Sequence, residues 1–353
     1  MLFQPFTQRG VTFRNRLAIS PMCQYSARDG VPDDWHLVHL ASRALGGAGL
    51  VLTEASAVSP QARISAADTG LWNEAQSQAW HRIVQRIEAH GAVAGIQLAH
   101  AGRKASTQVP WQGGGPLTGA QAWPTVSASA LPFDEGWHVP QALDAAGIAK
   151  LIADFRAAAA RAREAGFRVI ELHAAHGYLL HQFLSPLSNR RSDAYGGTLE
   201  NRIRLVCEVT TAVREVWPQD LPLWLRVSAT DWAEGGWDLA QTVQLAQALA
   251  PLGVDLVDVS SGGLVPHARI PVGPGYQVPF AAQLRREAGI ATGAVGMITS
   301  AAQAQAIIEK GEADMVLIAR ASLRDPYFPL HAARELGADV EVPVQYERAW
   351  TTR

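Results

Sequence analysis

The pattern that most constrains the fold is a helix, a glycine and a short apolar run, which recurs five times along the chain. A glycine just past a helix is typical of the left-handed C-cap, and a continuous apolar run is typical of a parallel strand covered on both faces. The five repeats are Gly91 with 92–98, Gly166 with 167–172, Gly253 with 254–259, Gly289 with 290–295 and Gly311 with 312–318. Three further runs, at 16–21, 49–53 and 222–227, bring the predicted strands to eight.

Apolar residues at helical spacing lie between these strands, at 80–87, 148–155, 203–213 and 239–246. Asn73 with Gln76, and Ser300 with Gln303, have the spacing of capping boxes that open helices. Strands that alternate with helices predict a parallel sheet with right-handed crossovers. Eight such units in 353 residues favour a (β/α)8 TIM barrel. A doubly wound dinucleotide-binding sheet is less favoured because no G-x-G-x-x-G follows the first strand.

One connection is much longer than the others. Between Leu98 and Asp144 the chain is rich in Gly, Pro, Ser and Trp, including Trp111, Trp123 and Trp137. Long loops in compact domains are usually functional or disordered, and the aromatic residues argue against disorder. We therefore expect an excursion after strand 3 that covers the barrel mouth, with most of its tryptophans packing as a lid. No linker divides the chain, so residues 1–353 are expected to form one barrel domain with a C-terminal tail.

Composition excludes several classes of function. The formal net charge is −2, so there is no electrostatic footprint for nucleic acid or an anionic membrane. The two cysteines, Cys23 and Cys207, are far apart and lack metal-type spacing, which indicates free thiols in a reducing compartment. The N-terminal residues have no apolar core of a signal peptide, and no run approaches a membrane span. We expect a cytoplasmic protein.

Chemistry-bearing residues gather where the predicted strands end, which is where barrels of this kind carry their sites. His173, His176 and Tyr178 follow the strand at 167–172. Two imidazoles could polarise a carbonyl oxygen with N–H donors, and a phenol could supply a proton. The glycine-rich turns after the last strands indicate a phosphate site at Gly296 and Arg320.

The same histidines allow other interpretations. An isolated pair spaced by three is more often two satisfied core residues than a site. A sharper alternative is a metal-dependent TIM-barrel lyase or hydrolase, with Glu171 and His181 as additional ligands. A barrel that binds flavin for sensing, without turnover, is a third possibility. Arg103 and Lys104 could be a solvated edge or a contact for NADPH phosphate, and the sequence does not decide between them.

Several motifs resemble the old yellow enzyme family. They are SPMCQYS at 20–26, GIQLAHAGRKA at 95–105, HAAHGYLLHQFLSPLSNRRSDAYGG at 173–197, LRVS at 225–228, DVSSG at 258–262 and TGAVGMI at 292–298. The closing VPVQYERAW at 342–350 resembles the bacterial, thermophilic-like subclass of FMN-dependent ene-reductases. The resemblance covers nearly the whole chain, and the HAAHGYLLHQFLSP stretch is its most specific part.

The resemblance implies a set of FMN contacts. Gln97 would hold the pyrimidine edge of the flavin, and Pro21, Met22 and Ala55 would line the ring. Arg226 would lie near N1 and C2=O, where a fixed cation stabilises the negative charge of the reduced flavin. Contacts to the ribityl phosphate region would come from Ser260, Gly296 and Arg320, beside Ala319, where relatives commonly have glycine. Glycine permits backbone conformations that alanine resists, so it is an open question whether the backbone at Ala319 can approach the phosphate as closely.

The resemblance also implies a reaction and its residues. His173 and His176 would donate hydrogen bonds to the carbonyl oxygen of an α,β-unsaturated substrate such as an enone. A hydride would pass from flavin N5 to the β-carbon, and Tyr178 would give a proton to the α-carbon from the opposite face. Tyr25 is the second phenol at the mouth, and Cys23 would tune the flavin and substrate binding. NADPH or NADH would first reduce the flavin in the same pocket.

The C-terminal tail carries one more implied site residue. In relatives, an arginine at the position of Arg348 reaches the active site of a neighbouring subunit. The resemblance therefore implies a homodimer or homotetramer in which Arg348 contacts the substrate of the adjacent protomer.

Overall fold

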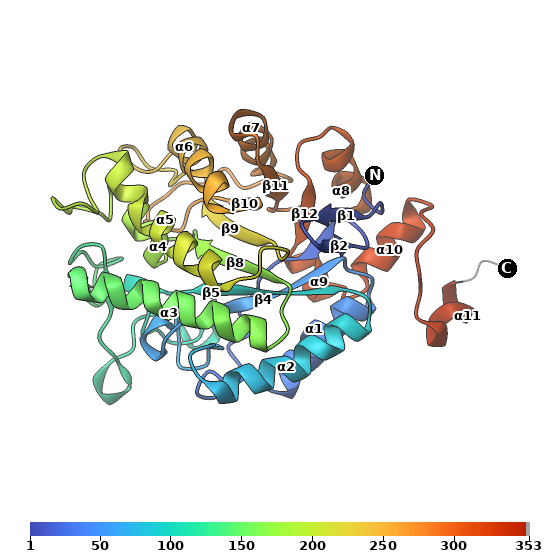
Figure 1. The fold of residues 1–353 in the computed structure, drawn as a ribbon, viewed down its shortest axis with the longest axis horizontal. Coiled ribbons are helices and arrows are strands. Elements are labelled where there is room, and N and C mark those ends of the chain that lie inside the picture. The colour runs from blue at the N-terminus through green and yellow to red at the C-terminus, as the bar shows by residue number, and fades with distance from the viewer. Residues whose placement is uncertain (351–353) are drawn as a thin grey trace.

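Eight parallel strands form a closed barrel in the computed structural model, which describes residues 1–350 (Figure 1). The order around the barrel is β3-β4-β5-β8-β9-β10-β11-β12, and β12 pairs with β3 to close it. The strands are β3 (Leu17–Ile19), β4 (Leu50–Ala57), β5 (Val93–Ala99), β8 (Val169–Ala174), β9 (Leu223–Ser228), β10 (Leu256–Ser260), β11 (Ala291–Ala294) and β12 (Met315–Ile318). All eight predicted strands are present, and the predicted (β/α)8 barrel is confirmed.

Helices follow the strands and pack around the outside of the barrel (Figure 1). The main ones are α1 (Asp34–Leu45), α2 (Glu74–Ala89), α3 (Ala145–Glu164), α5 (Leu199–Val216), α6 (Leu239–Leu249), α7 (Val278–Ala288), α8 (Ala301–Glu309) and α10 (Phe328–Glu335). The shorter ones are α4 (Leu179–Leu184), α9 (Arg320–Arg324) and α11 (Glu347–Trp350). All five glycines of the repeat have positive φ, between 66° and 98°, as their place after a helix predicts.

The two predicted capping boxes differ in detail. At α2, the side chain of Asn73 accepts from the backbone N–H of Gln76, and Gln76 reaches back to the N-cap, so this box is confirmed. At α8, Ser300 caps as expected, but the side chain of Gln303 accepts from Thr299 instead of from Ser300. The predicted second half of that box is therefore wrong. Either bond satisfies a backbone N–H that the helix leaves unpaired at its start.

The N-terminal mouth of the barrel is plugged by a hairpin that the sequence pattern did not predict. Strands β1 (Phe6–Gln8) and β2 (Val11–Phe13) pair antiparallel across the barrel floor. Phe13 is fully buried against Trp224 with ring centroids 5.9 Å apart, and the Trp224 indole donates to the side chain of Gln8. Since one end is filled by packed side chains, ligands can enter only at the C-terminal ends of the strands.

The long excursion after β5 is ordered, as its aromatic content predicts. It contains the short strands β6 (Val126–Ser127) and β7 (Gln141–Ala142), which pair in parallel before α3 begins. Trp137 lies against Phe133 of the same excursion. Trp123 lies beneath the guanidinium of Arg63, and the largely exposed Trp111 meets the edge of Tyr25, so both contact loops that follow other strands. The excursion thus adds side chains to one rim of the mouth.

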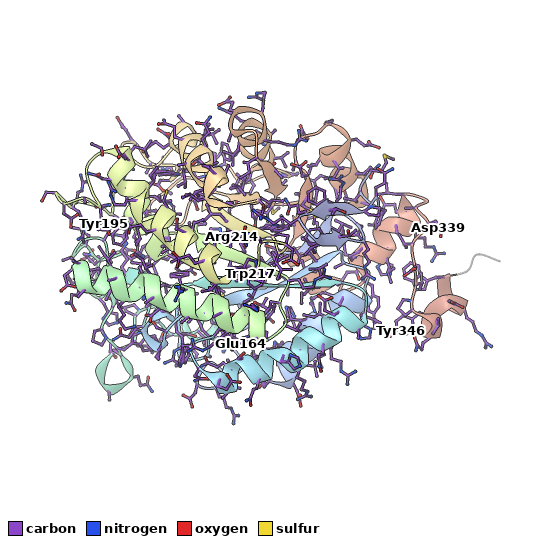
Figure 2. All side chains as sticks on the ribbon, viewed as in Figure 1. Glu164, Tyr195, Arg214, Trp217, Asp339 and Tyr346 are labelled. Atoms are coloured by element: carbon purple, nitrogen blue, oxygen red, sulfur yellow. The ribbon has the colours of Figure 1, made fainter. Side chains whose placement is uncertain are left out.

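The C-terminal segment leaves the barrel after α10. Figure 2 shows Asp339 and Tyr346 on the stretch that leads away from the barrel body toward α11. Aromatic side chains connect it to α10 and its N-cap: the Tyr346 hydroxyl lies 3.3 Å from that of Tyr327, and Trp350 stacks on His331. Arg348 is exposed on this segment. Among residues 1–350, no helix is both long enough and apolar enough to cross a membrane.

Candidate active site

The end of β8, which carries His173, and the turn after it, which carries His176, bring the two histidines and Tyr178 together. The ring of His173 lies 5.1 Å from that of His176 and 4.9 Å from that of Tyr178, both nearly edge-on. His176 has a φ of 58°, a conformation that non-glycine residues rarely adopt. The next residue must be glycine, because a Cβ on Gly177 would lie 2.2 Å from the backbone oxygen of Gly263. The predicted grouping of these side chains is confirmed, and its backbone is held in a strained turn.

A buried His–Asp pair supports that turn from below. Nε2 of His181 lies 2.8 Å from the carboxylate of Asp231, and Nδ1 accepts from the backbone N–H of Gly177. This arrangement assigns the proton of His181 to Nε2, facing Asp231. Ser185 donates to the same carboxylate at 2.6 Å. His181 therefore positions the turn, and its two nitrogens are already engaged.

Lys104 is a second support, and it settles a question that the sequence left open. Its ammonium donates to the backbone oxygens of His176 and Gly263, at 2.8 and 3.0 Å, and so joins the β8 turn to the loop after β10. Burial lowers the pKa of Lys104 to about 8, with a further contribution from Arg103. The guanidinium of Arg103 is likewise directed to backbone oxygens, including that of Leu264. Both cations thus hold loops together and do not form a solvated edge.

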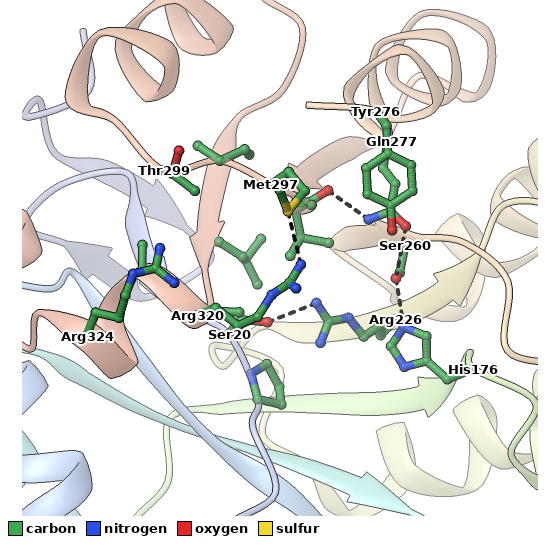
Figure 3. A pocket seen from close by; sticks show the side chains of 17 residues that line it. Ser20, His176, Arg226, Ser260, Tyr276, Gln277, Met297, Thr299, Arg320 and Arg324 are labelled. Atoms are coloured by element: carbon green, nitrogen blue, oxygen red, sulfur yellow. Dashed lines mark hydrogen bonds between the residues drawn. The ribbon is translucent and has the colours of Figure 1, made fainter. Parts of the chain in front are cut away.

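Beside this turn lies a cavity of about 330 Å³ at the C-terminal mouth of the barrel (Figure 3). That volume is within the range of small-molecule and cofactor sites. Nε2 of His176 lies 2.7 Å from the hydroxyl of Ser260 at one wall, and Arg226 donates to Ser20 at another. Of the residues predicted to bind the cofactor or substrate, the cavity is lined by Pro21, His176, Arg226, Ser260, Gly296, Ala319 and Arg320.

One end of the cavity has the character of an anion site. The guanidinium groups of Arg320 and Arg324 both line it, and within residues 1–350 neither forms an ion pair with a carboxylate. Gly296 has a φ of 117°, and a Cβ there would lie 2.6 Å from the side-chain nitrogen of Gln277. Ala319 has a negative φ of −106°, so the backbone does not need the glycine that relatives commonly have there. The donor set and the close backbone approach suit a phosphate.

Gln277 is a lining residue that sequence reasoning missed. Its side chain accepts from Ser261 at 2.7 Å and donates to the backbone oxygen of Val295 at 2.8 Å, so it ties the loops after β10 and β11 together. Gln277 precedes helix α7 and does not end a strand, so the positions of the strand ends in the sequence do not indicate it. Arg324 was also missed, although it follows Arg320 by one helical turn.

The other predicted residues do not line this cavity. Ala55 and Tyr178 line a separate small pocket, while Gln97 is buried within the barrel and donates to Glu171 at 2.8 Å. Met22, Cys23 and Tyr25 lie half-buried on the segment after β3. His173 does not line the cavity itself but lies against His176, which does. Arg348 lies on α11, on the segment that leads away from the barrel after α10, and does not line the cavity of its own chain.

The electrostatics keep the histidines neutral and the phenols protonated. Burial lowers the pKa of both His173 and His176 well below the usual histidine range, aided by Arg226 for His173 and by His173 for His176. Burial raises the pKa of Tyr178 well above its usual value, with Cys23 and Tyr25 adding to the effect. The pKa of the Cys23 thiol is also raised, first by burial and then by Asp68 and Glu54. The site therefore offers neutral N–H and O–H donors at neutral pH.

The residues required by the metal-dependent alternative are committed to other contacts. Glu171 faces Gln97 inside the barrel, and His181 is held by Asp231 and Gly177. In the part of the chain that the structure describes, no three His, Cys, Asp or Glu side chains are grouped as a metal ligand set. The geometry therefore gives that alternative no support.

Comparisons with known proteins agree with this site. Residues 1–339 match the model of the NADH:flavin oxidoreductase / NADH oxidase family. An NADPH dehydrogenase of Geobacillus thermodenitrificans is 50% identical over 99% of this chain and 98% of its own length. One from Listeria innocua is 51% identical over 99% of both. The structure of morphinone reductase in complex with tetrahydroNAD superposes with a TM-score of 0.78 at 30% identity, over 97% of this chain and 92% of that chain.

These matches cover the barrel and the strand ends from which the site is built. They confirm the resemblance inferred from the motifs, together with the expected FMN cofactor and nicotinamide reductant. The chain belongs to the NADH:flavin oxidoreductase / NADH oxidase family of FMN-dependent enzymes, which includes the old yellow enzymes.

Proposed function

We propose that this enzyme is an ene-reductase that reduces the activated C=C bond of α,β-unsaturated carbonyl compounds, with NADPH or NADH as the reductant. The observation that carries the proposal is the cluster of His173, His176 and Tyr178 beside a cavity that also presents Arg226 and an anion site. Two neutral N–H donors next to a protonated phenol suit a carbonyl substrate that must be polarised and then protonated.

FMN fits the residues that line the cavity. Its phosphate would be held by Arg320 and the backbone at Gly296, beside Ala319 and Ser260, and Arg226 would face the pyrimidine side of the ring. Pro21, Met22, Cys23 and Ala55 would border the ring, with Gln97 at its polar edge. When bound, FMN accepts a hydride from the nicotinamide and delivers one from N5 to the substrate β-carbon.

The side chains of this protein would supply the rest of the reaction. His173 and His176 would donate hydrogen bonds to the carbonyl oxygen, which makes the β-carbon electrophilic. Tyr178 would pass its phenolic proton to the α-carbon, and solvent would restore that proton. Tyr25 would contact the bound carbonyl compound from the other side of the mouth. His176 now meets Ser260, so a substrate would have to share or replace that contact.

The proposal is tested by the visible spectrum of the purified protein and by NADPH oxidation in the presence of 2-cyclohexenone. We expect a yellow protein that consumes NADPH and the enone in equal amounts. A colourless preparation that a chelator inactivates would favour the metal-dependent alternative. A flavin-bound protein that does not turn over would favour the sensing alternative.

We also propose a cytoplasmic location for the enzyme, and the two free cysteines agree with it.

Substitution of Gly296 by alanine should lower the affinity for FMN. The added Cβ would strike the side chain of Gln277, so either the loop after β11 or Gln277 must move. Gly197→Ala is the matched control, because Gly197 also has a positive φ, of 80°, but an added Cβ there would meet no atom within 4 Å. Equilibrium titration of the apoprotein with FMN measures the effect. Equal affinities in the two variants would contradict the proposed phosphate cradle.

We also propose that Arg348 acts on the active site of a second protomer in a homodimer or homotetramer. Its exposure on a segment that leads away from its own barrel supports this role. Truncation after Pro343, or Arg348→Ala in the full chain, should raise KM for 2-cyclohexenone several-fold, while the exposed neighbour substitution Glu347→Gln should not. A monomer with full activity, measured by light scattering and steady-state kinetics, would exclude the proposal.

A further inference from the structure

Three charged side chains from consecutive strands meet inside the barrel, below the cavity. Glu171 comes from β8, Arg226 from β9 and Asp258 from β10, and their side chains are almost completely buried. Arg226 and Asp258 are directly opposite each other in the strand register. The cluster therefore contains two fully buried carboxyl groups and one guanidinium, and of the three only Arg226 lines the cavity.

The two carboxyl groups have different partners. Nε of Arg226 lies 2.8 Å from Oδ2 of Asp258, while the same guanidinium donates to the hydroxyl of Ser20 at 3.0 Å. Glu171 instead accepts from the amide of Gln97 through Oε1, at 2.8 Å. The other oxygen of Glu171, Oε2, accepts no hydrogen bond from residues 1–350, and neither does either oxygen of Asp258. The contact between Arg226 and Asp258 is thus an ion pair without a well-directed hydrogen bond.

Such an arrangement is costly if both carboxyl groups are ionised. One guanidinium can balance one of them, and an uncompensated buried charge is strongly destabilising even after the surroundings relax. A proton between Glu171 and Asp258 would remove that charge and convert one unpartnered oxygen into a donor for another. The electrostatics agree: burial, and then the neighbouring charge of Asp258, raise the pKa of Glu171 well above its usual value. Burial also raises the pKa of Asp258, but Arg226 opposes that shift.

We propose that Glu171 and Asp258 share a single proton, held on Glu171, so that the pair carries one negative charge that balances Arg226. Both are then positioning residues: neither lines the cavity, and both act on the cofactor through Arg226. Asp258 sets how much positive charge Arg226 presents, and Glu171 anchors Gln97 on the neighbouring strand β5.

This balance bears on the reduction potential of the flavin. An uncompensated Arg226 would stabilise the negative charge of the reduced cofactor strongly and make it a weaker reductant. With Asp258 ionised beside it, Arg226 favours the reduced form less, and the reduced cofactor remains able to pass its electrons to the substrate. This step rests on the proposed placement of FMN above Arg226, whereas the shared proton does not.

Two variants test whether Glu171 and Asp258 together carry one negative charge or two. Glu171→Gln replaces a neutral acid by a neutral amide that can still accept from Gln97 and donate to Asp258. We expect the FMN reduction potential of this variant, measured by spectroelectrochemistry, to stay close to that of the unaltered holoenzyme. Adding Asp258→Asn removes the remaining negative charge, and the potential of the double variant should rise. If Glu171→Gln alone raised it as much as the second substitution does, both carboxyl groups would be ionised and the proposal would be wrong.

Infrared spectroscopy of the flavin-free protein tests the proton directly. Burial also raises the pKa of Glu54 well above its usual value, so the measurement is a difference spectrum between the unaltered protein and Glu171→Gln. In neutral H₂O and D₂O buffers this difference should contain the C=O stretch of a buried protonated carboxylic acid. A difference spectrum without that band would overturn the proposal even if the double variant failed to fold. Neither measurement requires turnover of an enone, so a failure of the proposed ene-reductase activity would be seen separately.

Discussion

Alanine in place of His173 or His176 is expected to lower turnover of 2-cyclohexenone by about 10² or more, because each loses one preorganised donor to the developing negative charge on oxygen. Both imidazoles are held neutral by burial, so each presents an N–H group without needing a proton from solvent. The loss should therefore fall mainly on reoxidation of the flavin by enone. Rapid-mixing measurements of the two half-reactions would show it.

Binding of a phenol provides a second readout of the same donors. p-Hydroxybenzaldehyde should perturb the flavin spectrum of the holoenzyme, and both alanine variants should bind it more weakly. His176→Asn is the matched control, because an amide can still donate a hydrogen bond and should recover part of the affinity. Near-normal turnover in both alanine variants would rule out the carbonyl-binding role. The surface substitution His81→Ala, on α2, should have no effect on either measurement.

The pKa shifts also predict how these donors respond to acid. In the folded protein the pKa of each histidine lies below its unfolded value of about 6.5. The unfolded chain therefore binds more protons as the pH falls through that value, and folding stability should decrease below about pH 6.5 on their account. Above that pH the two imidazoles are neutral in both states and contribute no pH dependence.

The barrel could be predicted from the sequence because its strands are buried on both faces and therefore appear as largely apolar runs. In addition, five of the eight strands follow a glycine that caps the preceding helix in the left-handed conformation. The hairpin of β1 and β2 escaped prediction because each strand has only three residues and its stability comes from contact with Trp224, more than 200 residues away. The pattern of apolar and polar residues within a short segment carries no information about a contact with so distant a residue.

The site could be predicted where its residues end strands, and not where they act through other residues. His173 lies at the C-terminal end of β8, and His176 and Tyr178 follow it directly, so the architecture places them at the mouth. Gln277 and Lys104 matter because they join loops from different strands, which only the folded chain reveals. Glu171 was considered as a metal ligand, but its actual neighbours, Gln97 and Asp258, come from other strands of the barrel.

Phenylalanine in place of Tyr178 should produce the other large effect, a loss of about 10² to 10⁴ in the rate at which enone reoxidises the flavin, because general acid catalysis typically contributes that much. Burial keeps the phenol protonated, and its ring lies against His173, next to the donors that would hold the carbonyl. Reduction of the flavin by NADPH needs no proton from Tyr178 and should proceed at nearly the original rate. Stopped-flow spectroscopy separates the two steps.

Tyr25→Phe is the matched comparison, since it removes the other phenol at the mouth. Tyr25 has a φ of 51° and meets Trp111 edge-on, so its ring is held by the excursion that follows β5. If it contacts the carbonyl compound without donating the proton, Tyr25→Phe should weaken phenol and enone binding more than it slows reoxidation at saturating enone. The reverse pattern, with fast reoxidation in Tyr178→Phe and slow reoxidation in Tyr25→Phe, would reassign the proton donor to Tyr25.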